Sequence, residues 1–474
     1  MNKILILIPT YNEKGNVQNL YDEIKRTKIK ADILFVDDNS PDGTAKIIKQ
    51  IARKDRKVNL LSRRTKDGIG SAHLYGIHWA YSRKYTILIT MDSDFTHKPT
   101  DIPKLISKMK NSDIVVGSRY LSKNSLEDWN PIRKSLTKIA HIMTTILLGL
   151  TYDATGAFRL YRIDKIPEKI FDVVESKTYS FFFESLFILN LNGFKITEIS
   201  ISLPARTYGN SKMKLSDVWS GFVLLIKTFY LSKIYRDSYI YAPPVVIPKK
   251  NRGRVEKEWD DYWLLERKQR KILYDAAAVF YRKHIIRQTL NRYVNKTFKK
   301  GARVLHAGCG GGQVDQDAVK RIRITALDIS SQALNRYKRL YGNSCEIMYG
   351  GIFNIPAKNG SFDGIYNLGV MEHFTEKDIA KILDEFHRVL KEKGKILLFW
   401  PPEFGLSVIF LNTVHFILND VLGKNIILHP EEITKVKSKK QIQRILAKSG
   451  FKLTNFNFGP NDLFTYTIIT GIRL

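Results

Sequence analysis

The sequence predicts an α/β protein with two domains in tandem. Short β-branched runs alternate with helical periods twice along the chain, once from the N-terminus and again from Ala302 onward, and the two series open with different turn chemistry. The length of 474 residues also favours more than one domain. A hydrophobic content of 44% excludes a disordered chain, and only two cysteines exclude a disulfide scaffold.

The first series predicts a parallel sheet whose carboxyl-end loops are available to ligands. Its expected strands are Lys3–Ile8, Asp32–Val36, Val58–Leu61, Thr86–Met91 and Asp113–Val116, and its expected helices are Val17–Arg26, Thr44–Ala52, Gly70–Ala80 and Ile102–Met109. Two amphipathic helices are expected at 134–150 and 215–235. We place this domain at residues 1–240.

The helix and strand pattern breaks at 241–258, a basic segment with several prolines that we interpret as a linker. Residues 259–298 have a helical pattern. A second βα series follows, with strands expected at Val304–Ala307, Ile324–Leu327, Gly364–Asn367 and Lys395–Phe399. The second domain is therefore expected at residues 259–474.

The formal charge of +31 is concentrated around the linker, because residues 241–300 contribute +10 of it. No aromatic-interleaved nucleic-acid motif accompanies these cations, so nucleic acid is not an expected partner. The polybasic stretch beside Trp259 and Trp263 favours an anionic membrane surface, and a solvated helix face is the alternative.

We expect no signal peptide, because the N-terminal apolar run is short and is followed by no cleavage site. The longest uncharged stretches, Ile139–Tyr152 and Phe404–Asn419, are shorter than the ~18–20 residues that a membrane span needs. Both can lie on a membrane. We expect a cytoplasmic protein that is peripheral at the cytosolic membrane face.

Four polar loops follow expected strands of the first domain, and together they carry most of its candidate chemistry. They are Pro-Thr-Tyr-Asn-Glu (9–13), Val-Asp-Asp-Asn-Ser-Pro-Asp-Gly-Thr (36–44), Met-Asp-Ser-Asp-Phe-Thr-His (91–97) and Gly-Ser-Arg-Tyr (117–120). Loops at the carboxyl ends of parallel strands converge on one crevice. Crowded carboxylates share a divalent cation, and oxygen ligands suit Mg²⁺ or Mn²⁺.

These motifs, with Asp-Ala-Thr-Gly-Ala-Phe-Arg (153–159) after them, resemble the family-2 glycosyltransferases with a GT-A (Rossmann-like) fold, in the dolichyl/polyprenyl-phosphate mannose synthase branch. The resemblance covers about half of the chain. It implies that Asp92 and Asp94 act on the metal and the donor diphosphate, whereas Thr96 stands where the family often has Gln or Ser. It also implies contacts with the donor nucleotide sugar by Pro9, Tyr11, Glu13, Val36, Asp38 and Asp92.

The chemistry of such a transfer can be argued from the acceptor. A phosphate monoester is ionised at neutral pH, so it attacks a sugar carbon without a general base, and the site must hold two anions together. Arginines suit that task. By resemblance, Arg119, Arg133 and Arg206 hold the lipid phosphate, and Ser211 and Lys212 close over the donor.

The second domain carries a glycine-rich turn, Gly-Cys-Gly-Gly-Gly (308–312), directly after a strand, and Asp328 ends the next strand. With Gly-Ser-Phe-Asp-Gly (360–364) and Val-Met-Glu-His-Phe (370–374), these residues resemble Rossmann-like class I S-adenosylmethionine-dependent methyltransferases. The resemblance implies cofactor binding by Gly308, Gly310, Gly312 and Asp328. The family usually has acids at the positions of His306 and Gly351, so weakened binding is expected. His373 is a candidate general base.

The leading hypothesis is a glycosyltransferase, fused to a methyltransferase-like domain, that moves a hexose, mannose from GDP-mannose, to polyprenyl or dolichyl phosphate. Methyltransferase activity of the second domain, which would make the enzyme bifunctional, is left open. Glucose from UDP-glucose is the nearest alternative. A further alternative is a membrane-associated scaffold whose second domain senses S-adenosylmethionine without turnover.

Overall fold

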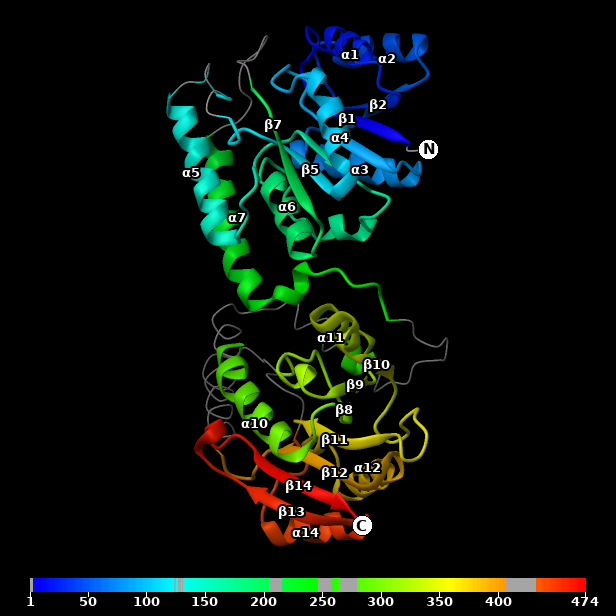
Figure 1. Ribbon diagram of the computed structural model, residues 1–474, viewed down its shortest axis with the longest axis vertical. Helices are drawn as coiled ribbons and strands as arrows, with labels where there is room; N and C mark the ends of the chain where they lie inside the picture. The colour runs from blue at the N-terminus through cyan, green and yellow to red at the C-terminus, as the bar shows by residue number, and fades with distance from the viewer. Residues whose placement is uncertain are drawn as a thin grey trace. The chain divides into compact units, whose positions relative to one another are not determined.

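A computed structural model describes residues 3–122, 125–126, 129, 131–203, 215–245, 257–261, 263, 279–405 and 432–474 (Figure 1). The chain divides into two compact units, Met1–Tyr241 and Ala242–Leu474. Each unit is built around a seven-stranded sheet.

The sheet of the first unit has the strand order β3-β2-β1-β4-β6-β5-β7. Its strands are β1 (Ile4–Thr10), β2 (Ala31–Asp37), β3 (Val58–Ser62), β4 (Ile87–Thr90), β5 (Ile114–Ser118), β6 (Arg159–Tyr161) and β7 (Ile196–Ser200). β6 runs antiparallel to its neighbours β4 and β5, and the other pairs are parallel. The five strands expected before residue 120 are confirmed, and β6 makes the complete sheet a mixed one.

Helices pack on both faces of this sheet, as the two faces of β1 show. Leu5 and Leu7 belong to a cluster with residues of α3 and α6, whereas Ile6 and Ile8 pack with residues of α1, α2 and α4. Alternate residues of a strand point to opposite faces, so β1 lies in the middle layer of three. The helices of the unit are α1 (Val17–Arg26), α2 (Thr44–Lys54), α3 (Ile69–Ser82), α4 (Ile102–Lys108), α5 (Pro131–Leu148), α6 (Phe181–Leu191) and α7 (Leu215–Ile234), with the short 3-10 helices Pro99–Asp101, Met109–Asn111, Glu168–Val173 and Arg236–Tyr239.

The sheet of the second unit has the order β10-β9-β8-β11-β12-β14-β13. Its strands are β8 (Arg303–Ala307), β9 (Arg323–Asp328), β10 (Glu346–Tyr349), β11 (Phe362–Leu368), β12 (Leu390–Trp400), β13 (Phe451–Asn457) and β14 (Thr467–Arg473). The first five strands are parallel, and β14 runs antiparallel to β12 and β13. The four strands expected here are confirmed.

Helices again cover both faces. Leu305 packs with residues of α12 and α14, and its neighbour Val304 packs with residues of α10 and α11. The helices are α10 (Arg287–Thr297), α11 (Ser331–Tyr341), α12 (Glu376–Val389) and α14 (Lys439–Lys448), with a π-helical turn at Arg282–Ile286 and 3-10 helices at Ala318–Lys320, Gly342–Ser344, η8 (Met371–His373) and Pro460–Asp462. The backbone N–H of Val245, in the first part of the expected linker, donates to Asn335 Oδ1 at 2.7 Å and so joins that part to α11.

Among the described residues, no helix has the length and apolar character required to cross a bilayer. Most of the expected linker, the polybasic stretch at 264–271 and residues 406–419 of the second uncharged stretch lie outside the described residues.

Candidate functional site

The sheet of the first unit has, at its carboxyl edge, the strand arrangement at which ligand-binding crevices form. The strand order reverses between β1 and β4, which lie side by side in parallel. Loops on the two sides of such a reversal leave the sheet in opposite directions and leave room for a ligand. The register places Pro9 of β1 beside Val36 of β2, so the first two predicted loops begin at the same level of the sheet.

Hydrogen bonds join these two loops. Asp37 Oδ1 accepts from the hydroxyls of Thr10 at 3.0 Å and Ser40 at 2.6 Å. Ser40 Oγ in turn accepts from the backbone N–H of Asn12 at 3.0 Å, and the backbone N–H of Glu13 donates to Thr44 Oγ1 at 2.9 Å. Asp37 therefore links the first two loops and fixes the positions of the predicted donor residues in them.

Asp38 is buried beside a cation that the sequence analysis did not single out. Arg63 Nε lies 3.3 Å from Asp38 Oδ1, and the two side chains are only 8% and 7% exposed. Burial raises the pKa of Asp38 to about 6, although Arg63 acts in the opposite direction. Arg63 directly follows β3, which is the signal that could have identified it. The predicted residue Tyr11 has the ammonium of Lys66 over its ring at 4.0 Å.

The third loop holds the Asp-x-Asp pair. Asp94 Oδ1 accepts from both the backbone N–H of Thr96, at 3.2 Å, and its hydroxyl, at 2.6 Å. Asp94 is buried, whereas the side chain of Asp92 is 31% exposed. The Thr96 hydroxyl is thus directed at Asp94.

His97 fixes the backbone of this loop. The backbone N–H of Asp92 donates to His97 Nδ1 at 2.9 Å, so this nitrogen carries no proton and the other ring nitrogen does. Burial lowers the pKa of His97 to about 4, and its ring stacks on Phe158 at 5.1 Å between centroids. The imidazole is therefore neutral at physiological pH.

The fourth loop carries Arg119, which the structure pairs with Asp153. The guanidinium donates from Nε at 2.7 Å and from Nη2 at 2.5 Å, and the Arg119 backbone N–H adds a third bond at 3.0 Å. Burial opposes ionisation of Asp153, but Arg119 outweighs it and lowers the pKa of that carboxyl. The backbone N–H of Asp153 donates to Glu198 at 2.7 Å. Asp153 fixes the orientation of Arg119.

The remaining predicted residues of this site fall outside what the structure describes. Arg206, Ser211 and Lys212 lie in the undescribed range 204–214, and the side chain of Arg133 in α5 is also undescribed. The structure thus brings together Pro9, Tyr11, Glu13, Val36, Asp38, Asp92, Asp94 and Arg119 at one sheet edge.

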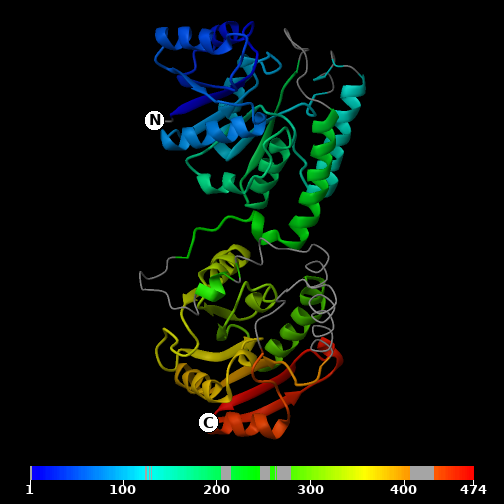
Figure 2. The same ribbon diagram turned by 180° about the vertical axis from the view of Figure 1, so that it is seen from behind.

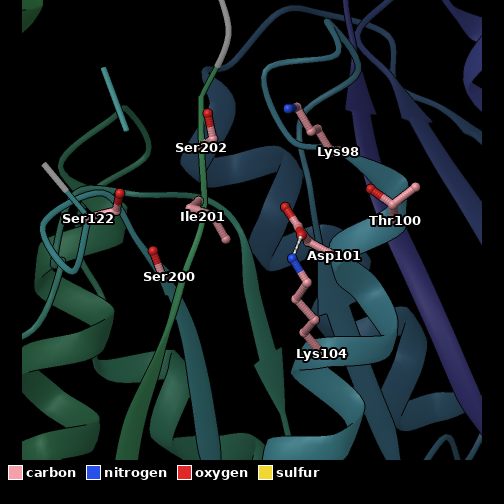
Figure 3. A pocket seen from close by; sticks show the side chains of 8 residues that line it. All are labelled: Lys98, Thr100, Asp101, Lys104, Ser122, Ser200, Ile201 and Ser202. Atoms are coloured by element: carbon pink, nitrogen blue, oxygen red, sulfur yellow. Dashed lines mark hydrogen bonds and ion pairs between the residues drawn. The ribbon is translucent and has the colours of Figure 1, made fainter. Parts of the chain in front are cut away.

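A cavity of about 440 Å³ flanks the third loop (Figure 3). Within it, Lys104 Nζ lies 2.6 Å from Asp101 Oδ1, so one of its cations is already paired. Lys98, which follows His97 in the chain, is one of the residues that line it. The lining residues are Lys98, Thr100, Asp101, Lys104, Ser122, Ser200, Ile201 and Ser202.

No cluster of three or more His, Cys, Asp or Glu side chains suited to a metal occurs in the described parts of the chain. The chemistry of the donor set nevertheless fits a divalent ion, since Asp92 and Asp94 offer carboxylate oxygens and a bound diphosphate would supply further oxygens.

The second unit places its glycine-rich turn at the equivalent edge, where the strand order reverses between β8 and β11. Gly308, Gly310 and Gly312 have φ angles of +71°, +50° and +68°, which residues with a side chain rarely adopt. The backbone N–H of Gly310 donates to Asp328 Oδ2 at 2.8 Å, and that of Ser330 donates to Oδ1 at 2.8 Å. The predicted cofactor residues therefore form one cluster.

His306 stands on β8 where the resembling family usually carries an acid, and the structure supplies an acid from another position. Asp315 Oδ2 lies 2.8 Å from His306 Nδ1 and accepts from the Tyr337 hydroxyl at 2.7 Å. The Asp315 and His306 side chains are both buried. The sequence analysis missed Asp315 because only the fold brings it beside His306.

Asp260 and Trp263 contact the same edge. Asp260 accepts from the hydroxyls of Ser330, at 2.6 Å, and Ser331, at 3.1 Å, and from the backbone N–H of Gln332 at 3.2 Å, so it is bonded to the start of α11. Trp263 lies against Gly310, since a Cβ at that glycine would be 2.9 Å from its ring. These aromatic and acidic residues, predicted only as part of a helical region, border the glycine-rich turn.

Comparison with known proteins identifies two families in this chain. Residues 5–168 match Glycosyl transferase family 2, and residues 304–394 match a Methyltransferase domain. An undecaprenyl-phosphate mannosyltransferase of Micrococcus luteus is 35% identical over 212 residues, which are 44% of this chain and 87% of that protein. A polyprenol monophosphomannose synthase of Mycolicibacterium smegmatis is 33% identical over 219 residues, which are 46% of this chain and 83% of that protein.

Among solved structures, a SAM-dependent methyltransferase from Methanosarcina mazei is 17% identical with a TM-score of 0.31, and it covers 38% of this chain and 97% of its own. The expected resemblances to a family-2 glycosyltransferase and to a methyltransferase are confirmed by the matches to the two families.

Proposed function

Because this chain belongs to glycosyl transferase family 2, we propose that its first domain transfers mannose from GDP-mannose to a polyprenyl phosphate. The observation that carries the proposal is the convergence of the predicted donor residues at one sheet edge, in a chain whose relatives are named for joining mannose to a polyprenyl phosphate. Dolichyl phosphate is the related acceptor that shares the same phosphate chemistry.

We assign the donor side to the loops after β1, β2 and β4. Pro9, Tyr11, Glu13, Val36 and Asp38 surround the nucleoside. Asp92 and Asp94 would hold Mg²⁺ or Mn²⁺, which when bound would neutralise the leaving diphosphate. His97 keeps the backbone of this loop in position through Asp92 N. Ser211 and Lys212 would close over the donor.

We assign the acceptor side to arginines. Arg119, Arg133 and Arg206 would bind the lipid phosphate, which needs no general base because it is already ionised. The Asp153 carboxylate holds the guanidinium of Arg119 in one orientation before the acceptor arrives. Pre-orientation of this kind lowers the reorganisation needed at the moment of transfer.

We propose that helices α5 and α7 form the membrane-facing surface. They lie side by side in both views (Figures 1 and 2) and leave apolar side chains exposed, with Ile146 at 74% and Trp219 at 68% exposure. The exposed apolar residues are Ile132, Leu136, Ile139, Ile142 and Ile146 on α5, and Val218, Trp219, Phe222, Val223 and Tyr230 on α7. Contiguous exposed apolar residues mark an interaction surface, and a lipid substrate favours a bilayer as its partner. We therefore place the protein at the cytosolic membrane face.

We place the second domain at residues 259–474, after a connection at 241–258, and propose that it binds S-adenosylmethionine as a methyl donor. Gly308, Gly310 and Gly312 would allow close backbone approach to the cofactor. Asp328 would accept from its ribose hydroxyls. The observed cradle fits this role, because a Cβ at Gly308 would lie 2.7 Å from Val370.

The transfer reaction can be tested with the full chain, Mg²⁺ or Mn²⁺, polyprenyl phosphate in vesicles, and radiolabelled GDP-mannose or UDP-glucose. We expect labelled lipid from GDP-mannose, abolished in Asp94→Asn. Asp113→Asn is the matched control, because Asp113 caps the opposite end of the sheet through Lys195 N. If only UDP-glucose gave labelled lipid, the transferred sugar would be glucose and not mannose. If neither donor gave labelled lipid, the synthase assignment would be refuted.

Membrane attachment can be tested by vesicle flotation. Trp219→Ser should reduce flotation, whereas Tyr75→Ser, at an exposed residue of α3, should not. Equal loss in both variants would contradict the assignment of α5 and α7.

Cofactor binding can be tested by calorimetry, which should show binding of S-adenosylmethionine to the wild type. Asp328→Ala should remove this binding, and Asp363→Ala, at the start of β11, should retain it. No heat from the folded wild type would refute cofactor binding.

A further inference from the structure

Glu372 is a buried acid in the second domain, and one of its carboxyl oxygens has no assigned partner. It lies in η8 (Met371–His373), directly after β11 and beside the reversal of strand order between β8 and β11. Its side chain is only 4% exposed, and its Oε2 has no hydrogen-bond partner among the described residues. Buried carboxyl oxygens are almost always partnered, so a ligand is expected to complete this one.

Contacts around two glycines place this carboxyl beside the glycine-rich turn. A Cβ at Gly308 would lie 2.7 Å from Val370, so the turn after β8 touches the segment after β11. A Cβ at the adjacent Gly369 would lie 3.4 Å from both Glu372 Oε1 and the Tyr466 hydroxyl. The Glu372 carboxyl and the Tyr466 hydroxyl therefore both lie beside Gly369. The next residue, Val370, contacts the glycine-rich turn at Gly308.

The surroundings of Glu372 bring the pKa of its carboxyl close to neutral pH. Burial raises the pKa of Glu372 to about 8, the charge of Glu432 acts in the same direction and Lys435 opposes it. Glu432 and Lys435 are themselves paired at 2.9 Å. The Tyr466 pKa is also raised, by burial and then by Glu372, so its hydroxyl stays protonated. A carboxyl in such surroundings is a typical general base.

We propose that Glu372 is the general base of a methyl transfer to a neutral hydroxyl compound, with Tyr466 holding the acceptor oxygen. This proposal rests on the proposed binding of S-adenosylmethionine. The acceptor oxygen would form a bond to the methyl carbon while the sulfur–methyl bond breaks and its electron pair stays on sulfur. The hydroxyl proton passes to the Glu372 carboxylate.

The carboxylate also selects against other acceptor classes. An anionic acceptor, such as a carboxylate or phosphate, needs no base and would be repelled by Glu372. A protonated amine would form an ion pair with the carboxylate, and its nitrogen would keep the proton that blocks attack. A hydroxyl is neutral on arrival and needs a proton acceptor during attack, so it matches the site.

The test is labelling of the full chain by a hydrophobic carbodiimide, which reacts with protonated carboxyls, with the modified residues identified by mass spectrometry. We expect Glu372 to be labelled at pH 6.5, to lose half of that labelling near pH 8, and to be protected by S-adenosylhomocysteine. Glu184 is the matched control: it is also buried with a raised pKa, but its oxygens accept from the backbone N–H groups of Glu175 and Ser176 at 3.1 and 2.8 Å. Glu184 should be labelled less and should not be protected.

Absence of labelling at Glu372, or labelling indifferent to S-adenosylhomocysteine, would overturn the proposal, because a carboxyl that a small reagent cannot reach cannot take a proton from an acceptor. Glu372→Gln should bind S-adenosylmethionine within about threefold of the wild type by calorimetry and lose the labelled peptide. A wild type that binds no S-adenosylmethionine would instead refute the cofactor assignment. Loss of cofactor binding in Glu372→Gln alone would show a structural role and overturn the base.

Discussion

Replacing Asp153 with asparagine removes one charge from an ion pair that lies almost wholly inside the first domain. The Asp153 side chain is 0% exposed and that of Arg119 is 8% exposed. Asparagine keeps the shape of the side chain and one acceptor oxygen, but it leaves the guanidinium charge without a partner. The penalty therefore comes from a buried unpaired charge rather than from a cavity.

Breaking a buried pair by removing one partner costs about 3–5 kcal/mol, and a domain of this size shifts by about 2–4 °C per kcal/mol, so the transition should fall by roughly 6–20 °C. Because the folded pKa of Asp153 is lowered, its contribution is present at neutral pH and above its ordinary value. It is lost only as the pH falls through the lowered folded value. The difference between wild type and variant should therefore be full at pH 7 and shrink only in strong acid.

Scanning calorimetry of the full chain at pH 7 measures this shift, with the transition of the second domain as an internal reference. Asp164→Asn is the matched control, because it breaks another Arg–Asp pair, Arg162–Asp164 at 2.8 Å, that is more exposed. Exposed pairs contribute about 1 kcal/mol or less. A shift for Asp153→Asn no larger than that for Asp164→Asn would refute the reasoning.

Three further predictions concern stability, each measured by calorimetry of the same chain. Because burial lowers the pKa of His97 to about 4, the first domain should lose stability, by up to ~3 kcal/mol, as the pH falls from about 6.5 toward 4, and His97→Gln should flatten this dependence. Gly312→Ala should lower the transition temperature of the second domain more than Gly301→Ala does. Both glycines have positive φ, but only at Gly312 would a Cβ lie 2.4 Å from a tyrosine ring of α11. Equal shifts would contradict the clash. Asp260→Ala should destabilise the second domain by about 1–3 kcal/mol through lost bonds to α11, whereas the exposed Asp261→Ala should not.

The sequence predicted the fold well where burial alone decides the pattern. β1 and β2 are buried on both faces, so their apolar runs are continuous and easily recognised. β6 was not predicted because it has only three residues, Arg159–Tyr161, and its first residue is a fully buried arginine. That arginine donates to Ala154 O and Ser185 Oγ, contacts that exist only in the folded domain.

The candidate sites show the same division. Asp38, Asp92 and Asp94 could be predicted because each belongs to a motif directly after a strand. Arg63 also directly follows a strand, but its partner Asp38, at 3.3 Å, is shown only by the fold. Asp315 could not be predicted, because its importance comes from His306, which the fold brings within 2.8 Å. A single sequence shows which residues lie at strand ends, but it does not show which of them meet.

In both domains the proposed site residues lie where the strand order reverses, and the two domains offer different groups there. In the first domain, carboxylates follow β2 and β4, so negative charge accumulates and requires a cation before a diphosphate can approach. In the second, the turn after β8 is glycine, which offers backbone without side chains, and the acids Asp328 and Glu372 lie in the segments after β9 and β11. We propose that the carboxylate of Asp328 there favours a ligand that brings its own positive charge, as a sulfonium does. The residues placed at the reversal, rather than the shared topology, therefore distinguish the proposed anionic donor of the first domain from the proposed cationic methyl donor of the second.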